Sequence, residues 1–366
     1  MIEGSVEPTA SIGVAPSARS DGFEITAPPM PNMPDRIPVT TPAANVRAMR
    51  NASDTAAEGS RNYTFPMASD LDLRGVWIPL ITPFAADGTV DGDAIERLCR
   101  EYLAAGCTGI VALGTTGESA ALDADEKRIV IDACARACAV TQAPLIVGTG
   151  TNNTRNTVAA TEALRDVPGV VGALVVVPYY VRPSEAGIVQ HMKVVAETAP
   201  VPLVVYNIPA RTGRGLGAES LLELARTPNI AGVKQAVPTV DADTLRLLSE
   251  APEGFSALGG EDTILYPLMT LGAAGPISAA AQVCTERFVA MIECGLTGKL
   301  EDGRAHAEAL LPVVQSIYVE PNPAVLKGVL HAQGKIATPD LRLPMTNASA
   351  GAIKATLAAI SAAGGS

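Results

Sequence analysis

A single lysine in an apolar stretch is the residue with the clearest chemical potential. Lys234 lies within 229-NIAGVKQAV-237, a short run typical of a buried strand, where lysine is rarely found unless it is paired or functional. A lysine amine attacks a ketone only when it is neutral, and burial favours the neutral form. The resulting imine withdraws electrons and acidifies the neighbouring carbon, so an aldol addition can follow. From this stretch alone, the solvated end of a strand is the favoured interpretation of Lys234, and the rest of the chain has to decide against it.

Hydroxyl and arginine side chains elsewhere could supply the other groups that such a reaction needs. A tyrosine phenol bonded to a threonine hydroxyl can shuttle protons. The motif 206-YNIPARTG-213 offers the tyrosine, and 114-GTTGES-119 offers two threonines. The backbone N–H groups of the glycine-rich turn could hold a carboxylate, and Arg211 could bind a second one bidentately. Each motif also has a simpler interpretation: an ordinary turn, a surface salt bridge or, for 179-YY-180, interface packing.

The elements that must position these residues begin at about Leu73, where short apolar runs start to alternate with amphipathic stretches. A helix is predicted over 91–106, with Gly106 as its terminator. Another is predicted over 123–137, with Asp123 as N-cap and Glu126 completing a capping box. We expect strands at 76–81, 109–113, 144–150, 171–177, 202–207, 230–234, 255–260 and 274–278.

Strands that alternate with helices in this number predict a (β/α)₈ TIM barrel, an α/β fold. A doubly wound sheet would show the same alternation, but neither GxGxxG nor GxxxxGK[ST] follows the first expected strand. In a barrel the active site lies at the C-terminal ends of the strands, which favours a functional Lys234. The ends of the expected strands carry Thr82 and Pro83, 114-GTTGES-119, 148-GTG-150, 178-PYY-180, 206-YNIPARTG-213, Lys234, 259-GGED-262 and Ser278.

The chain divides into three parts. Residues 1–72 are rich in Pro, Ala, Ser and Thr and predict a disordered or loosely attached N-terminal extension, or a stretch upstream of a natural start at Met67. Residues 73–281 form the expected barrel. Further helical segments, at about 284–298, 302–318, 322–333 and 347–363, make residues 282–366 an added C-terminal helical layer.

Composition excludes several classes of function. The chain has 366 residues and a formal net charge of -11, which argues against binding nucleic acid or an anionic membrane through bulk charge. No apolar run reaches the roughly 18–20 residues that a membrane helix needs. The six cysteines form no CxxC pair, and the three histidines are not spaced to join them in a zinc site. We expect a cytoplasmic protein without disulfides or a bound metal.

Together, the motifs resemble a known enzyme family. In their order and spacing, 114-GTTGES-119, 178-PYY-180, 206-YNIPARTG-213 and 231-AGVKQA-236 are similar to the dihydrodipicolinate synthase / N-acetylneuraminate lyase family of pyruvate-dependent class I aldolases. The resemblance covers the chain from Gly75 to its C-terminus. Two C-terminal pieces, 319-VEPNPAVLK-327 and 341-LRLPMT-346, favour the first-named branch of the family.

The resemblance implies a role for each candidate residue. Lys234 would form a Schiff base with pyruvate, and Tyr206 would be the central proton carrier. Thr116 would connect Tyr206 to Tyr180, which in this family reaches into the site of a neighbouring subunit. The remaining implied ligands are Thr115 and Thr116 for the pyruvate carboxylate, Arg211 for the carboxylate of L-aspartate 4-semialdehyde, and Gly260 and Ile277 as pocket lining.

The same resemblance implies a homodimer or homotetramer and neither metal nor organic cofactor. Two alternatives remain: another pyruvate-dependent aldolase or dehydratase of the family that acts on sugar acids, such as an N-acetylneuraminate lyase, and a barrel that binds a 2-keto acid without converting it. The intact set Lys234, Tyr206, Thr116 and Tyr180 argues against a mere binder, which needs no proton relay.

Two departures from the family pattern stand out. After the lysine, family members often have an acidic residue and then a glycine, whereas this chain has Gln235 and 237-VPT-239, which bears on the choice of aldehyde. In lysine-inhibited members, two histidines and a glutamate help to form an allosteric site. The matching positions here are Ala124, Lys127 and Asn156, while Ser119, Ala120, Asn152 and Tyr179 still match, so we predict weak or absent inhibition by lysine.

Overall fold

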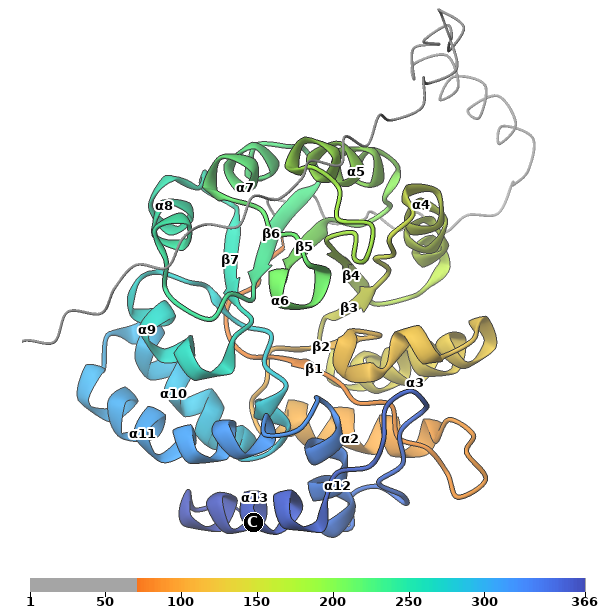
Figure 1. Ribbon diagram of the computed structural model, residues 1–366, viewed down its shortest axis with the longest axis vertical. Coiled ribbons are helices and arrows are strands. Elements are labelled where there is room, and N and C mark those ends of the chain that lie inside the picture. The colour runs from red at the N-terminus through yellow and green to blue at the C-terminus, as the bar shows by residue number, and fades with distance from the viewer. Residues whose placement is uncertain (1–70, 366) are drawn as a thin grey trace, which may run out of the picture. The chain divides into compact units, whose positions relative to one another are not determined.

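Eight parallel strands pair in chain order, as the alternating apolar runs predict (Figure 1). The computed structural model describes residues 71–365, so most of the predicted N-terminal extension, residues 1–70, lies outside the described residues. Every expected strand is confirmed, with ends shifted by at most a few residues. The strands are β1 (Trp77–Pro79), β2 (Gly109–Ala112), β3 (Leu145–Gly148), β4 (Val170–Val176), β5 (Leu203–Asn207), β6 (Ile230–Gln235), β7 (Ser256–Gly259) and β8 (Gly275–Pro276).

The sheet closes on itself between β8 and β1. Trp77 bridges in parallel to Ile277, and the Ser278 N–H donates to the Trp77 carbonyl at 3.1 Å. Because side chains alternate along a strand, one set of residues faces the barrel interior and the other faces the helices. In β2, for example, Val111 belongs to the interior cluster, whereas Ile110 packs in the larger cluster outside. The predicted (β/α)₈ barrel is therefore confirmed.

The interior of the barrel is filled by apolar side chains and is not a channel. Trp77, fully buried, donates its indole N–H to the Leu73 carbonyl at 3.0 Å, which fixes the chain just before β1. The described chain enters this core at Leu71, which is itself buried. The whole interior cluster contains Leu71, Leu73, Trp77, Val111, Ile146, Leu174, Val204, Tyr206, Ala231, Ala236, Leu258 and Ile277.

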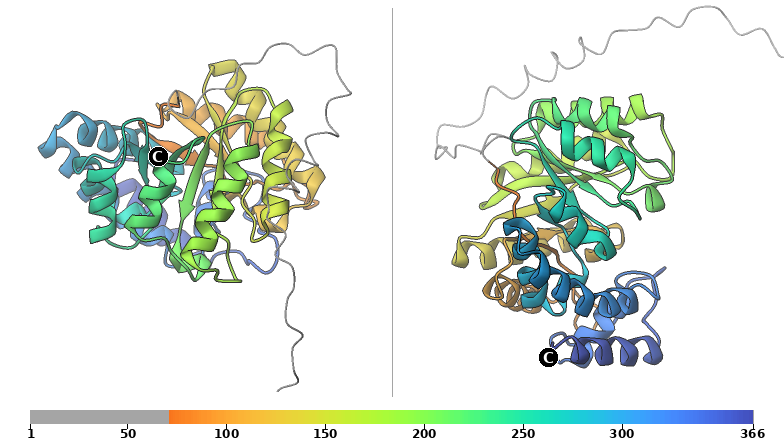
Figure 2. Two further views of the ribbon diagram at one scale, coloured as in Figure 1. Left: turned by 90° about the horizontal axis from the view of Figure 1, so that it is seen from above. Right: turned by 90° about the vertical axis from the view of Figure 1, so that its left-hand side faces the viewer.

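Helices surround the barrel and cover its outer face (Figures 1 and 2). The predicted capping box is present, with the Asp123 carboxylate accepting from the Glu126 N–H and the Glu126 carboxylate accepting from the Asp123 N–H. Gly106, just past the first helix, has the left-handed φ of +98° expected of a terminator. The helices that follow β1 to β7 are α2 (Gly92–Ala104), α3 (Ala124–Thr141), α4 (Thr154–Glu162), α5 (Glu185–Thr198), α6 (Pro209–Thr212), α7 (Ala218–Ala225), α8 (Ala242–Glu250) and α9 (Leu265–Thr270).

The predicted C-terminal helices also form, beginning directly after β8. They are α10 (Thr285–Thr297), α11 (Leu300–Ile317), α12 (Ala324–Ala332) and α13 (Ala350–Ala362). α10 packs against α9 and α11, and α13 packs against α11 and α12. In Figure 1 these blue helices lie below the barrel, near the orange helix α2. Across the described residues, no helix combines the length and apolar character that crossing a membrane requires.

Candidate active site

Lys234 and Tyr206 lie side by side at the C-terminal ends of two paired strands. Tyr206 in β5 and Lys234 in β6 are direct partners in the register of the sheet. The Lys234 Nζ lies 4.4 Å from the centroid of the Tyr206 ring. Both side chains are buried, with exposed fractions of 7% and 6%. The structure therefore places an amine and a phenol together at the strand ends, where barrel enzymes have their active sites.

The absence of a side chain at Gly260 leaves space for the Lys234 side chain. A Cβ atom at Gly260 would lie 2.9 Å from the Lys234 Cε and 2.8 Å from the Ala236 Cβ, closer than packed carbons allow. Ile277, the other predicted lining residue, is buried in the interior cluster together with Tyr206. Gly260 thus lies against the lysine, and Ile277 shares the interior cluster with the tyrosine.

Thr115 and Thr116 occupy a single 3₁₀ turn directly after β2 (Thr115–Gly117). Thr116 is buried, and its Oγ1 accepts a hydrogen bond from the Asn322 Nδ2 at 3.0 Å. Thr115 is exposed and lines a cavity of about 760 Å³. Tyr206 lines the same cavity, so the turn and the tyrosine face a common space.

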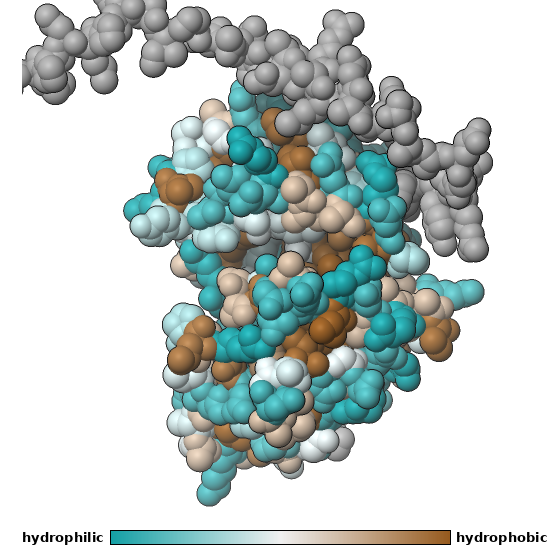
Figure 3. Space-filling view, turned by 90° about the vertical axis from the view of Figure 1, so that its right-hand side faces the viewer, coloured by the Kyte–Doolittle hydropathy of each residue, from teal (hydrophilic) through white to brown (hydrophobic). Residues whose placement is uncertain are grey.

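Arg211 and Tyr180 differ in their relation to that cavity. Arg211, in the short helix α6, is exposed and lines the cavity. Tyr180 has an exposed fraction of 86% and a left-handed φ of +70°. It does not line the cavity. Among the predicted site residues, Thr115, Tyr206 and Arg211 therefore share the lining of one cavity, whereas Tyr180 is exposed outside it. On the face that carries α3 and α4, apolar side chains gather near the middle, bordered by polar ones (Figure 3).

The buried Asp262 forms a hydrogen-bonded pair with Tyr318 that the sequence did not single out. The Asp262 Oδ2 accepts from the Tyr318 hydroxyl at 2.7 Å and from the Ala280 N–H at 2.9 Å. Burial raises the pKa of the Asp262 carboxyl, while those hydrogen bonds and the positive charge of Lys234 act in the opposite direction. Burial also raises the pKa of Tyr318. Asp262 belongs to 259-GGED-262, but nothing in the sequence indicates that its partner is Tyr318, the residue directly after α11.

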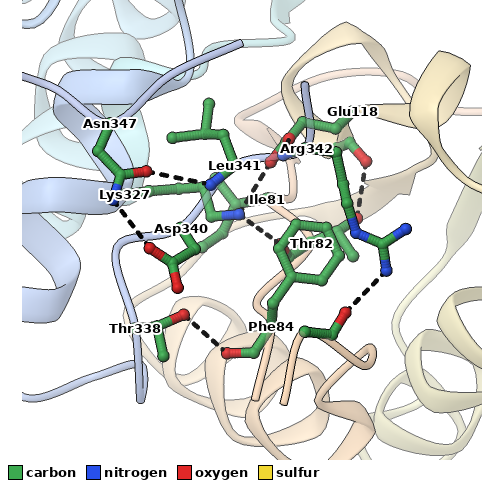
Figure 4. A network of polar contacts seen from close by, with 12 residues as sticks. Ile81, Thr82, Phe84, Glu118, Lys327, Thr338, Asp340, Leu341, Arg342 and Asn347 are labelled. Atoms are coloured by element: carbon green, nitrogen blue, oxygen red, sulfur yellow. Dashed lines mark hydrogen bonds and ion pairs between the residues drawn. The ribbon is translucent and has the colours of Figure 1, made fainter. Parts of the chain in front are cut away.

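A buried ion pair holds the turn that carries the two threonines. Lys327 in α12 is completely buried, and its Nζ donates to the Glu118 Oε1 at 2.8 Å and to the Thr82 carbonyl at 2.9 Å (Figure 4). The other Glu118 oxygen accepts from the Arg342 N–H at 2.9 Å. Burial lowers the pKa of Lys327, and the Glu118 carboxylate offsets part of that effect. The C-terminal helical region therefore fixes the position of the loop after β2.

Gln235, which follows the lysine where family members often have an acidic residue, connects structural elements of the barrel. It is buried, and its Oε1 accepts from the Asn207 Nδ2 at 2.8 Å. Its Nε2 donates to the Thr244 Oγ1 at 3.2 Å, which ties β6 to α8. Because neighbouring residues of a strand face opposite sides, Gln235 points away from the face that carries Lys234.

A buried lysine beside a tyrosine at the strand ends of a (β/α)₈ barrel is the arrangement of a Schiff-base, class I aldolase. The chain belongs to the dihydrodipicolinate synthetase family, whose model matches residues 72–363.

Named relatives and solved structures agree with this assignment. The chain is 38% identical over 292 residues to the 4-hydroxy-tetrahydrodipicolinate synthase of Neisseria gonorrhoeae, covering 80% of this chain and 99% of the relative. It is 39% identical over 284 residues to that of Cellvibrio japonicus, covering 76% and 94%. The crystal structure of dihydrodipicolinate synthase from Thermotoga maritima matches with a TM-score of 0.76 and 32% identity, covering 80% of this chain and 99% of that one. The enzyme from Acinetobacter baumannii in complex with pyruvate gives the same values.

Proposed function

We propose that the protein catalyses the reaction of a 4-hydroxy-tetrahydrodipicolinate synthase, the condensation of pyruvate with L-aspartate 4-semialdehyde on the diaminopimelate route to lysine. The pairing of Lys234 with Tyr206 across β5 and β6 carries the proposal, because it joins an imine-forming amine to a proton carrier. The names of the relatives favour this reaction over that of a sugar-acid aldolase. One solved relative is a complex with pyruvate, the substrate proposed here.

The chemistry starts at the Lys234 amine. The neutral amine attacks the ketone carbon of pyruvate, and water leaves to give an imine. Loss of a methyl proton gives an enamine, whose carbon attacks the aldehyde carbon of the semialdehyde. The new alkoxide takes up a proton. The amino group of the former semialdehyde then attacks the imine carbon and displaces Lys234, which closes the ring and regenerates the enzyme.

The hydroxyl groups would move the protons in these steps. Tyr206, whose ring lies beside the amine, is the proposed carrier between the imine and the alkoxide. Thr116 would connect it to Tyr180 of a second copy of the chain. The exposure of Tyr180 supports this role, because a side chain that extends outward can complete a neighbour's site. The proposed active unit is therefore a homodimer, alone or paired into a homotetramer, in the cytoplasm.

Two positions would bind the carboxylates of the substrates. The turn with Thr115 and Thr116 would hold that of pyruvate, and Arg211 would hold that of the semialdehyde. Arg211 suits the second task because its guanidinium can form two parallel bonds to a carboxylate at the edge of the cavity. Because the substrate becomes covalently attached to Lys234, the proposal includes no metal or organic cofactor.

Pyruvate consumption in the presence of L-aspartate 4-semialdehyde tests the proposal. We expect turnover by the wild type and background rates for Lys234→Ala. The matched control is Lys193→Ala, which removes an exposed lysine paired with Glu223 on the surface and should leave turnover unchanged. Borohydride with labelled pyruvate should modify Lys234 only. An imine that forms without consumption of the semialdehyde would refute the synthase reaction and favour a sugar-acid substrate.

Arg211→Gln tests the proposed contact with the second substrate. Loss of the charge-assisted bonds should raise KM for the semialdehyde by roughly 10- to 100-fold, from about 1.5–3 kcal/mol of lost binding. KM for pyruvate should change little. Arg214→Gln, two residues beyond the short helix, is the control because Arg214 is also exposed but does not line the cavity. An equal rise in both KM values would contradict the assignment.

A further inference from the structure

Asn322 connects the C-terminal region directly to the threonine of the proposed proton relay. It lies between α11 and α12, and its Nδ2 donates to the Thr116 Oγ1 at 3.0 Å across a separation of 206 residues in the chain. Both residues are buried, with exposed fractions of 9% for Asn322 and 4% for Thr116. Asn322 also lines the cavity that Tyr206 and Arg211 line.

This hydrogen bond determines what the Thr116 hydroxyl can do. A hydroxyl has one proton to donate and two lone pairs to accept with. Since Asn322 donates to the Thr116 Oγ1, the Thr116 proton has to point to another acceptor. One lone pair remains for a second donor. The amide thus keeps the hydroxyl able to give a proton in one direction and to receive one, which is what a relay requires.

A buried ion pair that follows Asn322 in the chain helps to fix its position. Five residues further on, Lys327 forms its buried ion pair with Glu118, two residues beyond Thr116 (Figure 4). Glu118 also accepts from the Arg342 N–H. The segment that carries Asn322 and the turn that carries Thr116 are therefore tied together twice, so their mutual distance has little freedom to change.

The amide oxygen of Asn322 makes no contact that would explain it as part of the described scaffold. Its Oδ1 is buried and has no hydrogen-bond partner among the described residues. Buried amides that serve the scaffold usually have both ends satisfied, as Gln235 does. In the described part of the chain, the Asn322 amide makes its one side-chain hydrogen bond to Thr116, and it lines the cavity. A role in the active site explains this arrangement better than a role in the scaffold.

We propose that Asn322 is a positioning residue that sets the direction in which Thr116 transfers its proton. This inference rests on the proposed function, because it assumes that protons move through Thr116. It does not depend on which aldehyde the enzyme accepts. Pyruvate alone can therefore report on it, through exchange of its methyl protons with solvent by way of the imine and the enamine.

The test compares this exchange in the wild type, Asn322→Ala, Asn322→Asp and the control Asn347→Ala. Asn347 is an exposed asparagine of the same region that bonds to the Leu341 N–H and to Asp340, not to the loop after β2. Proton NMR in D₂O gives the exchange rate, and borohydride trapping gives the amount of imine. We expect Asn322→Ala to slow exchange by about 10- to 100-fold while imine is still trapped, because one proton relay is impaired. The control should match the wild type.

Asn322→Asp separates a positioning role from a merely structural one. When protonated, the new carboxyl can donate to Thr116 as the amide does. When ionised, it can only accept, so it takes the Thr116 proton out of the relay. We therefore expect exchange to fall as pH rises through the pKa of the new group, relative to the wild type. Rates within twofold of the wild type for both variants, or a loss by Asn322→Asp that is equal at all pH values, would overturn the inference.

The two proposals fail in different ways. If the wild type exchanges pyruvate protons but does not consume the semialdehyde, the synthase reaction fails and the comparison of Asn322 variants still decides this inference. If the wild type condenses both substrates and the variants behave as it does, the synthase reaction stands and Asn322 has no positioning role.

Discussion

Tyr206 and Lys234 face each other across adjacent parallel strands, with the lysine Nζ 4.4 Å from the centre of the tyrosine ring. A cation above an aromatic face is attracted to it, so the ring helps to hold the amine in place. The phenol hydroxyl belongs to the same side chain. One residue can therefore both position the nucleophile and exchange protons with what becomes attached to it.

Tyr206→Phe separates these two roles. The ring and its contact with Lys234 remain, so borohydride should still trap pyruvate on the lysine. The hydroxyl is lost, so turnover should fall by about 10²- to 10⁴-fold. Tyr102→Phe is the matched control, since the buried Tyr102 hydroxyl in α2 has no partner within residues 71–365 and its removal should leave turnover unchanged. Turnover of Tyr206→Phe within a few-fold of the wild type would exclude Tyr206 as the proton carrier.

Gly260→Ala should displace the Lys234 side chain. The added methyl group would lie 2.9 Å from the Lys234 Cε and 2.8 Å from the Ala236 Cβ, so the flexible lysine has to move. A misplaced nucleophile can cost on the order of 10²-fold in rate, and we expect the rate of imine trapping to fall by that order. Gly92→Ala at the start of α2 meets only an ordinary contact at 3.6 Å and serves as control. Unchanged trapping would show that the lysine has an alternative productive position.

The sequence could predict the parts of this structure that depend on local patterns. Strands such as β4 and β5 are continuous apolar runs with ends marked by Gly, Pro or Asn, and the capping box of α3 needs only residues 123–126. Lys234 was recognisable because a lysine is conspicuous in an apolar strand. Tyr206 was recognisable because it opens the motif 206-YNIPARTG-213 near the end of the preceding strand.

Long-range polar pairs could not be predicted in this way. Glu118 and Lys327 are 209 residues apart, and nothing near either residue indicates a partner. The bond between Thr116 and Asn322 is equally remote, although both lie in motifs that the sequence had marked. Such pairs arise from how α12 packs against the loop after β2. Periodicity along one segment contains no information about that packing.

Breaking the buried ion pair should destabilise the fold. Glu118→Gln leaves the fully buried Lys327 without its counter-charge, and losing one partner of such a pair costs about 3–5 kcal/mol. Replacing both, with Glu118→Gln and Lys327→Met together, should cost less than Glu118→Gln alone, because no uncompensated charge stays buried. Urea unfolding measures the free energy of unfolding of the single and the double variant. Glu250→Gln, which breaks the exposed pair with Arg246, is the control and should leave stability nearly unchanged. Equal losses for the single and double variants would contradict this account.

Feedback by lysine should be weak or absent. Lys127 stands where the family resemblance implies a histidine in lysine-inhibited members, and it is half-buried in the lining of the cavity that Ser119 and Tyr179 also line. A cation there should repel the ammonium groups of lysine, and Asn156 supplies no carboxylate to attract them. Initial rates with added lysine check this, and Lys127→His is expected to increase sensitivity. Inhibition of the wild type at sub-millimolar lysine would refute the prediction.

His191 should make the fold sensitive to acid. It lies in α5 with an exposed fraction of 6%, and its Nδ1 is 2.9 Å from the Thr154 Oγ1. Burial lowers its pKa from 6.5 to about 4, so the folded protein disfavours the charged imidazolium. The unfolded chain binds a proton below about pH 6.5, whereas the folded chain does so only below about pH 4. The stabilisation is therefore complete above pH 6.5 and is lost as pH falls towards 4.

The expected loss between these limits is about 3 kcal/mol for this one group, because a tenfold change in proton affinity corresponds to about 1.36 kcal/mol. His191→Gln removes the titrating ring and keeps a polar group that can reach Thr154. Urea unfolding at pH 7 and at pH 4.5 should show a smaller difference for the variant than for the wild type. Because other groups titrate equally in both proteins, subtracting one difference from the other isolates His191. Identical pH dependence in the two proteins would mean that the His191 ring reaches water when protonated.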